Sequence, residues 1–324
     1  MSRSGDFFTA SQILRRLLTL VPVLAVVAVV VFVLIHVAPG DPAAVMAGSD
    51  ANTERIEQLR HQMGLDRPLL EQFWTWVTRA LQGDLGDSYF LVQPVTLSLA
   101  QRMEPTGLLT LYALILSIVI GLPAGIIAAL RRNSWVDRVM MVTALGGVCI
   151  PSFWFGILMI LVFAVWLRWL PAAGYVSFME DPLGNFRYLL MPAFSLGLQS
   201  AALLARVVRS SMLEVLREDY VRTARAKGLR ERLVVVRHAL PNTLIPALTI
   251  IGNSMGTLLG GAVVTEVVFN TPGVGRLVVQ SVLRRDFPVI QGAILAIAAV
   301  YVLVNLVVDI AYVIADPRIR QSSR

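Results

Sequence analysis

The sequence contains few charged residues for its length. Only 15% of the 324 residues are Asp, Glu, Lys or Arg, whereas 56% are hydrophobic. Soluble domains usually contain about 25% charged and roughly 45–50% apolar residues. Because there is too little charge to cover a soluble surface of this size, we expect an integral membrane protein. The composition excludes an ordinary soluble enzyme, a fibrous repeat and a disordered chain.

Cysteine, lysine and histidine are also rare. The single cysteine, Cys149, excludes an internal disulfide and a multi-cysteine metal site. The single lysine, Lys227, is followed by Gly228, so the chain lacks a Walker lysine and cannot hydrolyse ATP with a P-loop. The three histidines are scattered and His-Glu-x-x-His is absent. We therefore predict no catalytic residue and no metal site.

Six apolar stretches are long enough to cross a membrane as helices. A spanning helix takes about 20 residues, and we place the stretches at 17–37, 105–130, 139–167, 188–208, 243–264 and 289–314. The first is longer than the apolar region of a signal peptide, which predicts an uncleaved span. The third contains Pro151 near its middle, which predicts a kinked or strongly tilted helix.

Basic residues are distributed unevenly among the segments that connect these spans. With the N-terminus in the cytoplasm, 18 of the 28 basic residues but only 8 of the 21 acidic residues fall on the cytoplasmic side. The positive-inside rule therefore predicts a multi-pass protein of the cell (inner or plasma) membrane with both termini in the cytoplasm. Because topology explains the basic excess, we predict the lipid bilayer as a partner and no nucleic acid.

The long segment 39–104 lies outside the cell in this topology. Apolar residues recur at helical spacing over 56–63 and 69–77, which predicts two short amphipathic helices. Gly64 is a typical stop for the first helix, and Pro68 is a typical first-turn residue for the second. The segment is either a platform that receives a soluble partner or a structural cap on the helix bundle.

Segment 209–242 is the most informative part of the cytoplasmic side. One helical face holds Tyr220, Ala224, Lys227 and Gly228. Gly228 is typical of a residue that ends a helix. A second helix is predicted from about Arg230 to just before Pro241. The segment is either a basic loop that enforces topology or a helical hairpin that contacts another protein.

This hairpin resembles the cytoplasmic coupling motif of ABC importer permeases: Glu-Ala-Ala, three residues, Gly, nine residues, Ile, one residue, Leu-Pro. The sequence matches the motif at Ala224, Gly228, Leu240 and Pro241, with the interval from Gly to Pro intact. It departs from the motif at Arg222, Thr223 and His238, and these departures resemble the dipeptide and oligopeptide branch of the family. Similar stretches occur along nearly the whole chain, at 39–42, 64–68, 83–86, 151–153, 170–171, 269–275 and 316–318.

The resemblance implies the type I ABC importer permease fold, an all-α membrane protein with six transmembrane helices and a long extracytoplasmic loop after the first. It also implies a non-catalytic permease subunit that forms half of a translocation pathway for di- or oligopeptides. A second permease, two cytoplasmic ABC ATPases that bind ATP and Mg, and an extracytoplasmic solute-binding protein would complete the importer.

The resemblance further implies that the hairpin 219–241 couples the chain to the ATPases. Ala224 and Gly228 would sit in a groove of the ATPase, because small residues allow close approach. The full set of coupling residues would be Asp219, Tyr220, Arg222, Ala224, Arg225, Lys227, Gly228, Leu240 and Pro241.

Small and polar residues in the spans suggest two further sites. Gly252, Gly256 and Gly260 are four residues apart, which predicts a helix-packing seam against a second permease or within the chain. The candidate translocation path comprises Asn253, Ser254, Thr257, Glu266, Asn305 and Asp309. Glu266 is either part of an outer gate or an interface residue. Asp309 is either functional or paired with a loop arginine.

We expect three parts along the chain: residues 1–94 with the first span and the extracytoplasmic loop, the five-helix core 95–315, and a cytoplasmic tail 316–324. Two other functions remain open. One is an ABC permease for a nickel chelate, glutathione or haem, and the other is a secondary transporter or channel that works alone.

Overall fold

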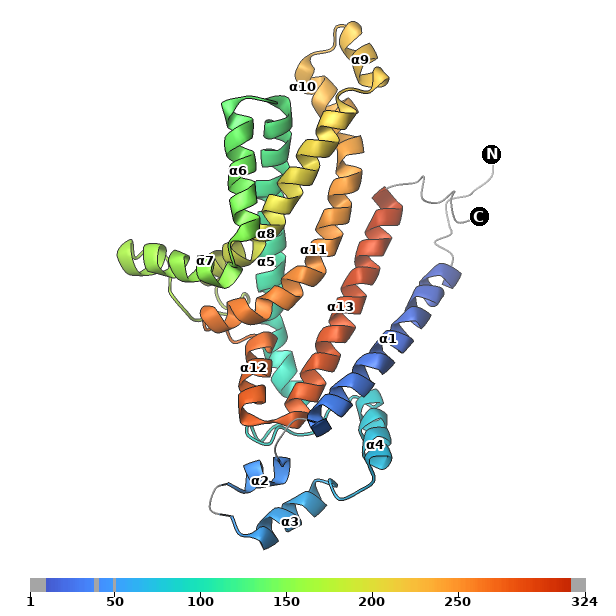
Figure 1. Cartoon of the computed structure of the whole chain (residues 1–324), viewed down its shortest axis with the longest axis vertical. Helices are drawn as coiled ribbons and strands as arrows, with labels where there is room; N and C mark the ends of the chain where they lie inside the picture. Colours follow the sequence, from blue (N-terminus) through green and yellow to red (C-terminus); the bar gives the residue numbers. More distant parts are fainter. Residues whose placement is uncertain (1–9, 38–40, 49–50, 316–324) are drawn as a thin grey trace. The chain divides into compact units, whose positions relative to one another are not determined.

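The computed structural model describes residues 10–37, 41–48 and 51–315, and nearly all of them are helical (Figure 1). Among these residues, β structure is limited to an isolated bridge between Asp87 and Pro94. The contacts divide the chain into two units, Met1–Met103 with Arg276–Leu306, and Glu104–Gly275 with Val307–Arg324. The all-α prediction is confirmed. The functional boundaries at 94 and 315 stay predictions, and the tail 316–324 lies outside the described residues.

The first unit begins with α1 (Ala10–Val37) and three shorter helices, α2 (Pro42–Ala47), α3 (Thr53–Gln62) and α4 (Leu69–Leu81). It also contains the start of α5 (Val95–Leu130) and most of α12 (Val274–Arg284) and α13 (Phe287–Ala315). The two amphipathic helices predicted after the first span are confirmed as α3 and α4. Gly64 turns the chain between them with φ +68°, and Pro68 precedes α4. Helix α2 was not predicted.

Side chains join these helices within the unit. The Phe32 ring of α1 lies 5.2 Å from the Phe73 ring and 6.4 Å from the Trp76 ring of α4, measured between centroids. The Ser88 hydroxyl donates to the buried Asp286 carboxylate at 2.5 Å. Burial, followed by the negative charge of Asp286, raises the pKa of the Tyr89 phenol. The loop before α5 is therefore tied to the turn before α13.

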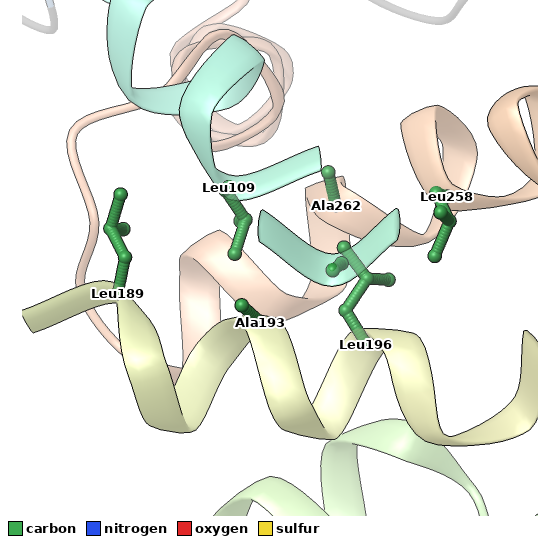
Figure 2. Packing of buried hydrophobic residues seen from close by; sticks show 7 residues of the cluster. Leu109, Leu189, Ala193, Leu196, Leu258 and Ala262 are labelled. Atoms are coloured by element: carbon green, nitrogen blue, oxygen red, sulfur yellow. The ribbon is translucent and has the colours of Figure 1, made fainter. Parts of the chain in front are cut away.

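The second unit contains the rest of α5 and the following elements: α6 (Trp135–Cys149), α7 (Ser152–Met159), the π-helix η1 (Ile160–Trp166), α8 (Pro182–Val215), α9 (Asp219–Ala226), α10 (Glu231–Leu233), the π-helix η2 (Val234–Ala239) and α11 (Leu240–Val268). Its core is formed where α5, α8 and α11 meet. Figure 2 shows the buried side chains of that cluster: Leu109, Leu189, Ala193, Leu196, Leu258 and Ala262.

Among the described residues, four helices are long and apolar enough to cross a membrane: Val95–Leu130, Pro182–Val215, Glu231–Val268 and Phe287–Val308. The first three contain the predicted spans 105–130, 188–208 and 243–264 in full, and the fourth contains residues 289–308 of the predicted span 289–314. The apolar part of α1 that the structure describes in full, Val21–Val33, is shorter. The total of six spans therefore stays a prediction.

The third predicted span is not one kinked helix. Helix α6 ends at Cys149, and the chain resumes in α7 and η1 after a bend of 106°. Pro151 causes the break, because a proline has no backbone N–H and forces the residue before it into extended backbone. Ile150 accordingly has φ −80° and ψ 124°. The Ser195 hydroxyl of α8 donates to the Ser152 carbonyl at 2.6 Å and holds the break in place.

Close packing of α5 on α8 depends on glycines outside the predicted seam. A Cβ on Gly121 would lie 2.5 Å from the Ala201 carbonyl oxygen, and one on Gly125 would lie 2.5 Å from the Ala205 carbonyl oxygen. Gly197 faces Ala113 of α5 equally closely. Small residues spaced by four on both helices therefore bring the two backbones together.

Candidate coupling site and translocation path

The predicted coupling hairpin exists and extends from one end of α8 and α11 (Figure 1). Helix α9 begins at Asp219, three residues after α8 gives way to a turn, and ends at Ala226. Gly228 follows with φ +76°, which favours glycine, and no atom lies within 4 Å of the position of its missing Cβ. The turn therefore needs a glycine for its backbone conformation, and the space around it is open.

The sequence predicts that the second helix of the hairpin ends before Pro241, but in the structure this helix continues past the proline. The chain is helical without interruption from Glu231 to Val268, and Pro241 lies near the start of α11. The π-helix η2 precedes the proline. A π turn shifts the hydrogen-bond register, so the chain accommodates a residue that cannot donate. The hairpin is thus continuous with the membrane helix α11.

The hairpin has its own small core. Val221, Ala224 and Val234 are buried against one another, and Val215, Leu216 and Leu229 pack around them. Ala224 is only 5% exposed. This corrects the expectation that Ala224 faces a groove of another protein: it packs α9 onto the second helix instead. A methyl group fits there because the two helices of so short a hairpin lie close together.

An ion pair closes the hairpin. The Arg225 guanidinium donates to both carboxylate oxygens of Glu231, at 3.1 and 2.6 Å, and the paired carboxylate raises the pKa of Arg225. The Asn242 amide donates to the Tyr220 hydroxyl at 2.7 Å, which ties α9 to the start of α11. Arg225, predicted as an outward charge contact, therefore has an internal partner.

The outer face of α9 carries the remaining predicted coupling residues. Asp219, Tyr220, Arg222 and Lys227 are all exposed. Arg222 lies 3.3 Å from Asp219, a weak surface pair one turn apart. Pro241 is exposed, and Leu240 packs on a core of Met212, Val235 and Ala239 at the hairpin's base. The structure thus divides the predicted coupling residues into an exposed group, which includes the basic residues Arg222 and Lys227, and an inward group that packs within the hairpin.

The three seam glycines of α11 differ in their surroundings. Gly252 is buried, Gly256 is half-buried, and Gly260 is exposed with open space at the position of its missing Cβ. The seam therefore runs from the interior of this unit to its surface. Only the Gly260 end is available to another helix.

The polar residues beside that seam do not form one lining. Asn253 and Thr257 are exposed, whereas Ser254 is buried and donates to the Ile250 carbonyl of its own helix at 2.8 Å. Residues 252–256 also fit Gly-x-Ser-x-Gly, the pattern of a nucleophile elbow. That elbow requires a strand-to-helix turn, and Ser254 lies inside a membrane-type helix, so the match is coincidental.

Glu266 is fully buried at the end of α11, next to the segment 269–275. The Thr106 hydroxyl of α5 donates to Glu266 Oε1 at 2.6 Å and accepts from the Val274 N–H at 2.8 Å. The carboxylate of Glu266 occupies the place where a Cβ on Gly273 would be. Glu266 is therefore part of a buried polar network that fixes the 269–275 loop. Sequence reasoning missed Thr106, because a threonine in an apolar helix carries no signal of its partner.

The last two candidates of the translocation path are Asn305 and Asp309. Asn305 is half-buried in the first unit, whereas Asn253, Ser254, Thr257 and Glu266 belong to the second. The side chain of Asp309 lies outside the described residues. The path therefore stays a prediction.

Two family models match separate parts of the chain. Residues 121–321 match the family model of the binding-protein-dependent transport system inner membrane component. Residues 10–100 match the model of the N-terminal part of such membrane components. Together the two models cover most of the chain.

Curated relatives are similar over their full length. The chain is 46% identical over 310 residues to the glutathione transport system permease protein GsiC of Escherichia coli, covering 96% of this chain and 99% of the relative. It is 45% identical over 308 residues to a putative peptide transport system permease protein of Brucella abortus, covering 95% and 98%. A chain of the MetNI methionine ABC transporter, in an inward-facing conformation, shares the fold, with a TM-score of 0.57, 19% identity, and coverage of 67% of this chain and 96% of that chain.

Proposed function

Because the chain belongs to the family of inner membrane components of binding-protein-dependent transport systems, we propose that it is the permease subunit of an ATP-driven importer of short peptides. It is a membrane protein of an ABC importer permease family, whose members are typically non-catalytic. In this proposal it forms half of the translocation pathway, and a second permease subunit forms the other half.

The hairpin α9–α10 would couple ATP hydrolysis by the partner ATPases to movement of this chain. The observation that supports this role best is the combination of an internal core with an outward basic face. Val221, Ala224 and Val234 make the hairpin rigid, and it continues directly into the membrane helix α11. A rigid element transmits a displacement, whereas a loop absorbs it. The exposed Tyr220, Arg222 and Lys227 would contact the ATPase.

The remaining subunits follow from this assignment. Two cytoplasmic ABC ATPases would bind ATP and Mg, and this chain would bind no cofactor of its own. An extracytoplasmic solute-binding protein would deliver the substrate. The positive-inside distribution of arginines supports a cytoplasmic hairpin and cytoplasmic termini, with segment 39–104 outside.

Charge reversal on the outer face of the hairpin tests the coupling role. The complete importer carrying Arg222→Glu and Lys227→Glu is reconstituted in liposomes, and both peptide uptake and ATP hydrolysis are measured. Like charges across an interface weaken it strongly, so we expect uptake to fall about tenfold. Arg131→Glu, a reversal at another exposed arginine, is the matched control and should keep normal uptake. Normal uptake in the double variant would refute the coupling role.

The substrate class is tested separately. Its support is the 45% identity to a putative peptide transport permease, and the 46% identity to a glutathione transport permease supports glutathione as the second candidate. Uptake of radiolabelled trialanine, competed with glutathione, separates the two. A complex that takes up glutathione and leaves trialanine outside would establish the alternative.

A further inference from the structure

Helix α4 carries an apolar stripe that is exposed in the structure. Leu70, Trp74 and Leu81 are 70%, 57% and 83% exposed, and the half-buried Val77 lies between them in the sequence. The spacing of these four positions places them on one face of the helix. Exposed apolar patches mark contacts with a membrane, a ligand or another protein. The stripe of Leu70, Trp74, Val77 and Leu81 is therefore a candidate contact surface.

Two other sides of α4 face the chain itself. The Phe73 and Trp76 rings lie 5.2 and 6.4 Å from the Phe32 ring of α1, measured between centroids. Gln72 and Arg79, which are seven residues apart and share a face, line a cavity of about 450 Å³ between α1, the α3–α4 turn, α4 and the start of α13. The helix thus has one packed side, one polar side and the exposed stripe.

Helix α4 lies beside the end of α1 (Figure 1). His36, in the last turn of α1, has its Nε2 3.2 Å from Gln72 Oε1 of α4. In the preceding turns of α1, Val29, Val30 and Val33 are 47%, 48% and 49% exposed. In a membrane protein, apolar side chains exposed on such a helix face the lipid. Because α4 packs on these same turns, lipid around the valines would also reach α4.

The chemistry of the stripe suits the bilayer interface. Its four side chains carry no charge, and the two charged residues of α4, Glu71 and Arg79, lie off the stripe. Trp74 adds an indole, a group that is enriched at membrane–water interfaces. Amphipathic helices bind such an interface by burying the apolar face and keeping the charged face in water. A soluble partner would have to displace lipid from this surface, because the stripe adjoins the lipid-facing turns of α1.

We propose that the stripe of α4 inserts into the lipid bilayer beside α1 and contacts the acyl chains of the outer leaflet. Contact with lipid rests on the stripe and on its neighbour α1, whereas the choice of the outer leaflet rests on the proposed topology. Insertion would fix one side of α4 in the membrane, and the opposite side, with Gln72 and Arg79, would keep facing the cavity. The extracytoplasmic segment would then be held to the membrane as well as to α1.

A polarity-sensitive fluorophore at single cysteines of the assembled complex in nanodiscs tests this contact. Cys149→Ser removes the single native cysteine, and one position at a time is then labelled. Leu81→Cys places the fluorophore on the stripe, and Arg79→Cys, the matched control, places it on the opposite side of the same helix. We expect spin-labelled phosphatidylcholine to quench the fluorophore at position 81 several-fold more than the one at position 79. Aqueous iodide should quench in the reverse order.

Equal quenching by lipid at the two positions would overturn the proposal. Added solute-binding protein that shields position 81 from iodide would assign the stripe to a protein partner and also overturn it.

Hydrogen exchange of the α4 amides in the same nanodiscs provides a second measurement. Leu70→Gln/Leu81→Gln makes the stripe polar and should speed this exchange several-fold, because α4 loses its hold on the bilayer. Glu71→Gln/Arg79→Gln, which places two glutamines off the stripe, should exchange as the parent chain does. Equal exchange in the two double variants would contradict insertion. Neither measurement requires transport, so the outcome is independent of the proposed peptide import.

Discussion

Asp137 and Arg209 form a bidentate ion pair between the start of α6 and the later part of α8. Arg209 Nε lies 2.6 Å from Asp137 Oδ1, and its Nη2 lies 2.8 Å from Oδ2. The Asp137 side chain is only 4% exposed, and the Asn133 N–H also donates to it at 2.9 Å. The pair holds together two helices in the half of α8 that leads into the hairpin α9–α10.

Removing one charge of this pair should destabilise the protein. Asp137→Asn leaves the Arg209 guanidinium without its anion in a largely buried position, and we expect a loss of about 1–3 kcal/mol in the free energy of unfolding. Thermal unfolding of the detergent-solubilised chain measures the effect. The double variant Asp137→Asn/Arg209→Gln should lose less than the two single losses combined. Additive losses would show that the pair does not act as a unit.

Gly273 should tolerate no side chain while Glu266 keeps its carboxylate. Because that carboxylate occupies the place of a Cβ, Gly273→Ala must displace Glu266 or the loop, at about 1–3 kcal/mol. In a Glu266→Ala background the same substitution should cost much less, since the space is then empty. Unfolding of the four variants of this cycle provides the measurement, and an equal cost in both backgrounds would contradict the proposed contact.

The α5–α8 contact should be more sensitive to a methyl group than the predicted seam on α11. Gly125→Ala places a Cβ 2.5 Å from the Ala205 carbonyl oxygen, so we expect a loss of at least about 1–3 kcal/mol in stability. Gly260→Ala adds the same methyl in open space and should leave stability unchanged. Unfolding temperatures compare the two. A larger substitution, Gly260→Leu, should weaken co-purification of the second permease if the seam contacts it, and unchanged co-purification would exclude that contact.

Gly228 should be replaceable by asparagine but not by valine. Its φ of +76° lies in the left-handed region, where asparagine is tolerated and a β-branched residue is strongly strained. We expect Gly228→Asn to retain coupled transport and Gly228→Val to lose about 1–2 kcal/mol of local stability. Hydrogen exchange of the amides in α9 reports that loss directly. Equal exchange in both variants would indicate that the turn is not held in the left-handed conformation.

The helices that repetitive patterns encode were predictable from the sequence. Apolar runs located the long helices, and Gly64 and Pro68 marked the end of α3 and the start of α4, because these signals act over a few neighbouring residues. Gly228 marked the end of α9 for the same reason. The proline at 241 wrongly predicted the end of a helix. In the structure a π-helix precedes Pro241, and the helix continues past it.

Contacts between distant residues were not predictable in the same way. The pattern 220–228 placed Tyr220 and Ala224 on one face, yet Tyr220 is exposed and Ala224 is buried against Val234. Which side of α9 faces inward depends on the position of the second helix, and local periodicity carries no information about that. The same holds for Thr106 and Glu266, which are 160 residues apart.

The scarcity and distribution of charge thus determined from sequence alone that this is a helical membrane protein and where its outward charges cluster. Only the tertiary structure decided which glycines permit close packing, which arginines are already paired, and that α1, α4 and α13 enclose a cavity. The physical reason is that hydropathy and helix-terminal signals are sums over adjacent residues. Pairing and cavity formation depend instead on where separate helices meet.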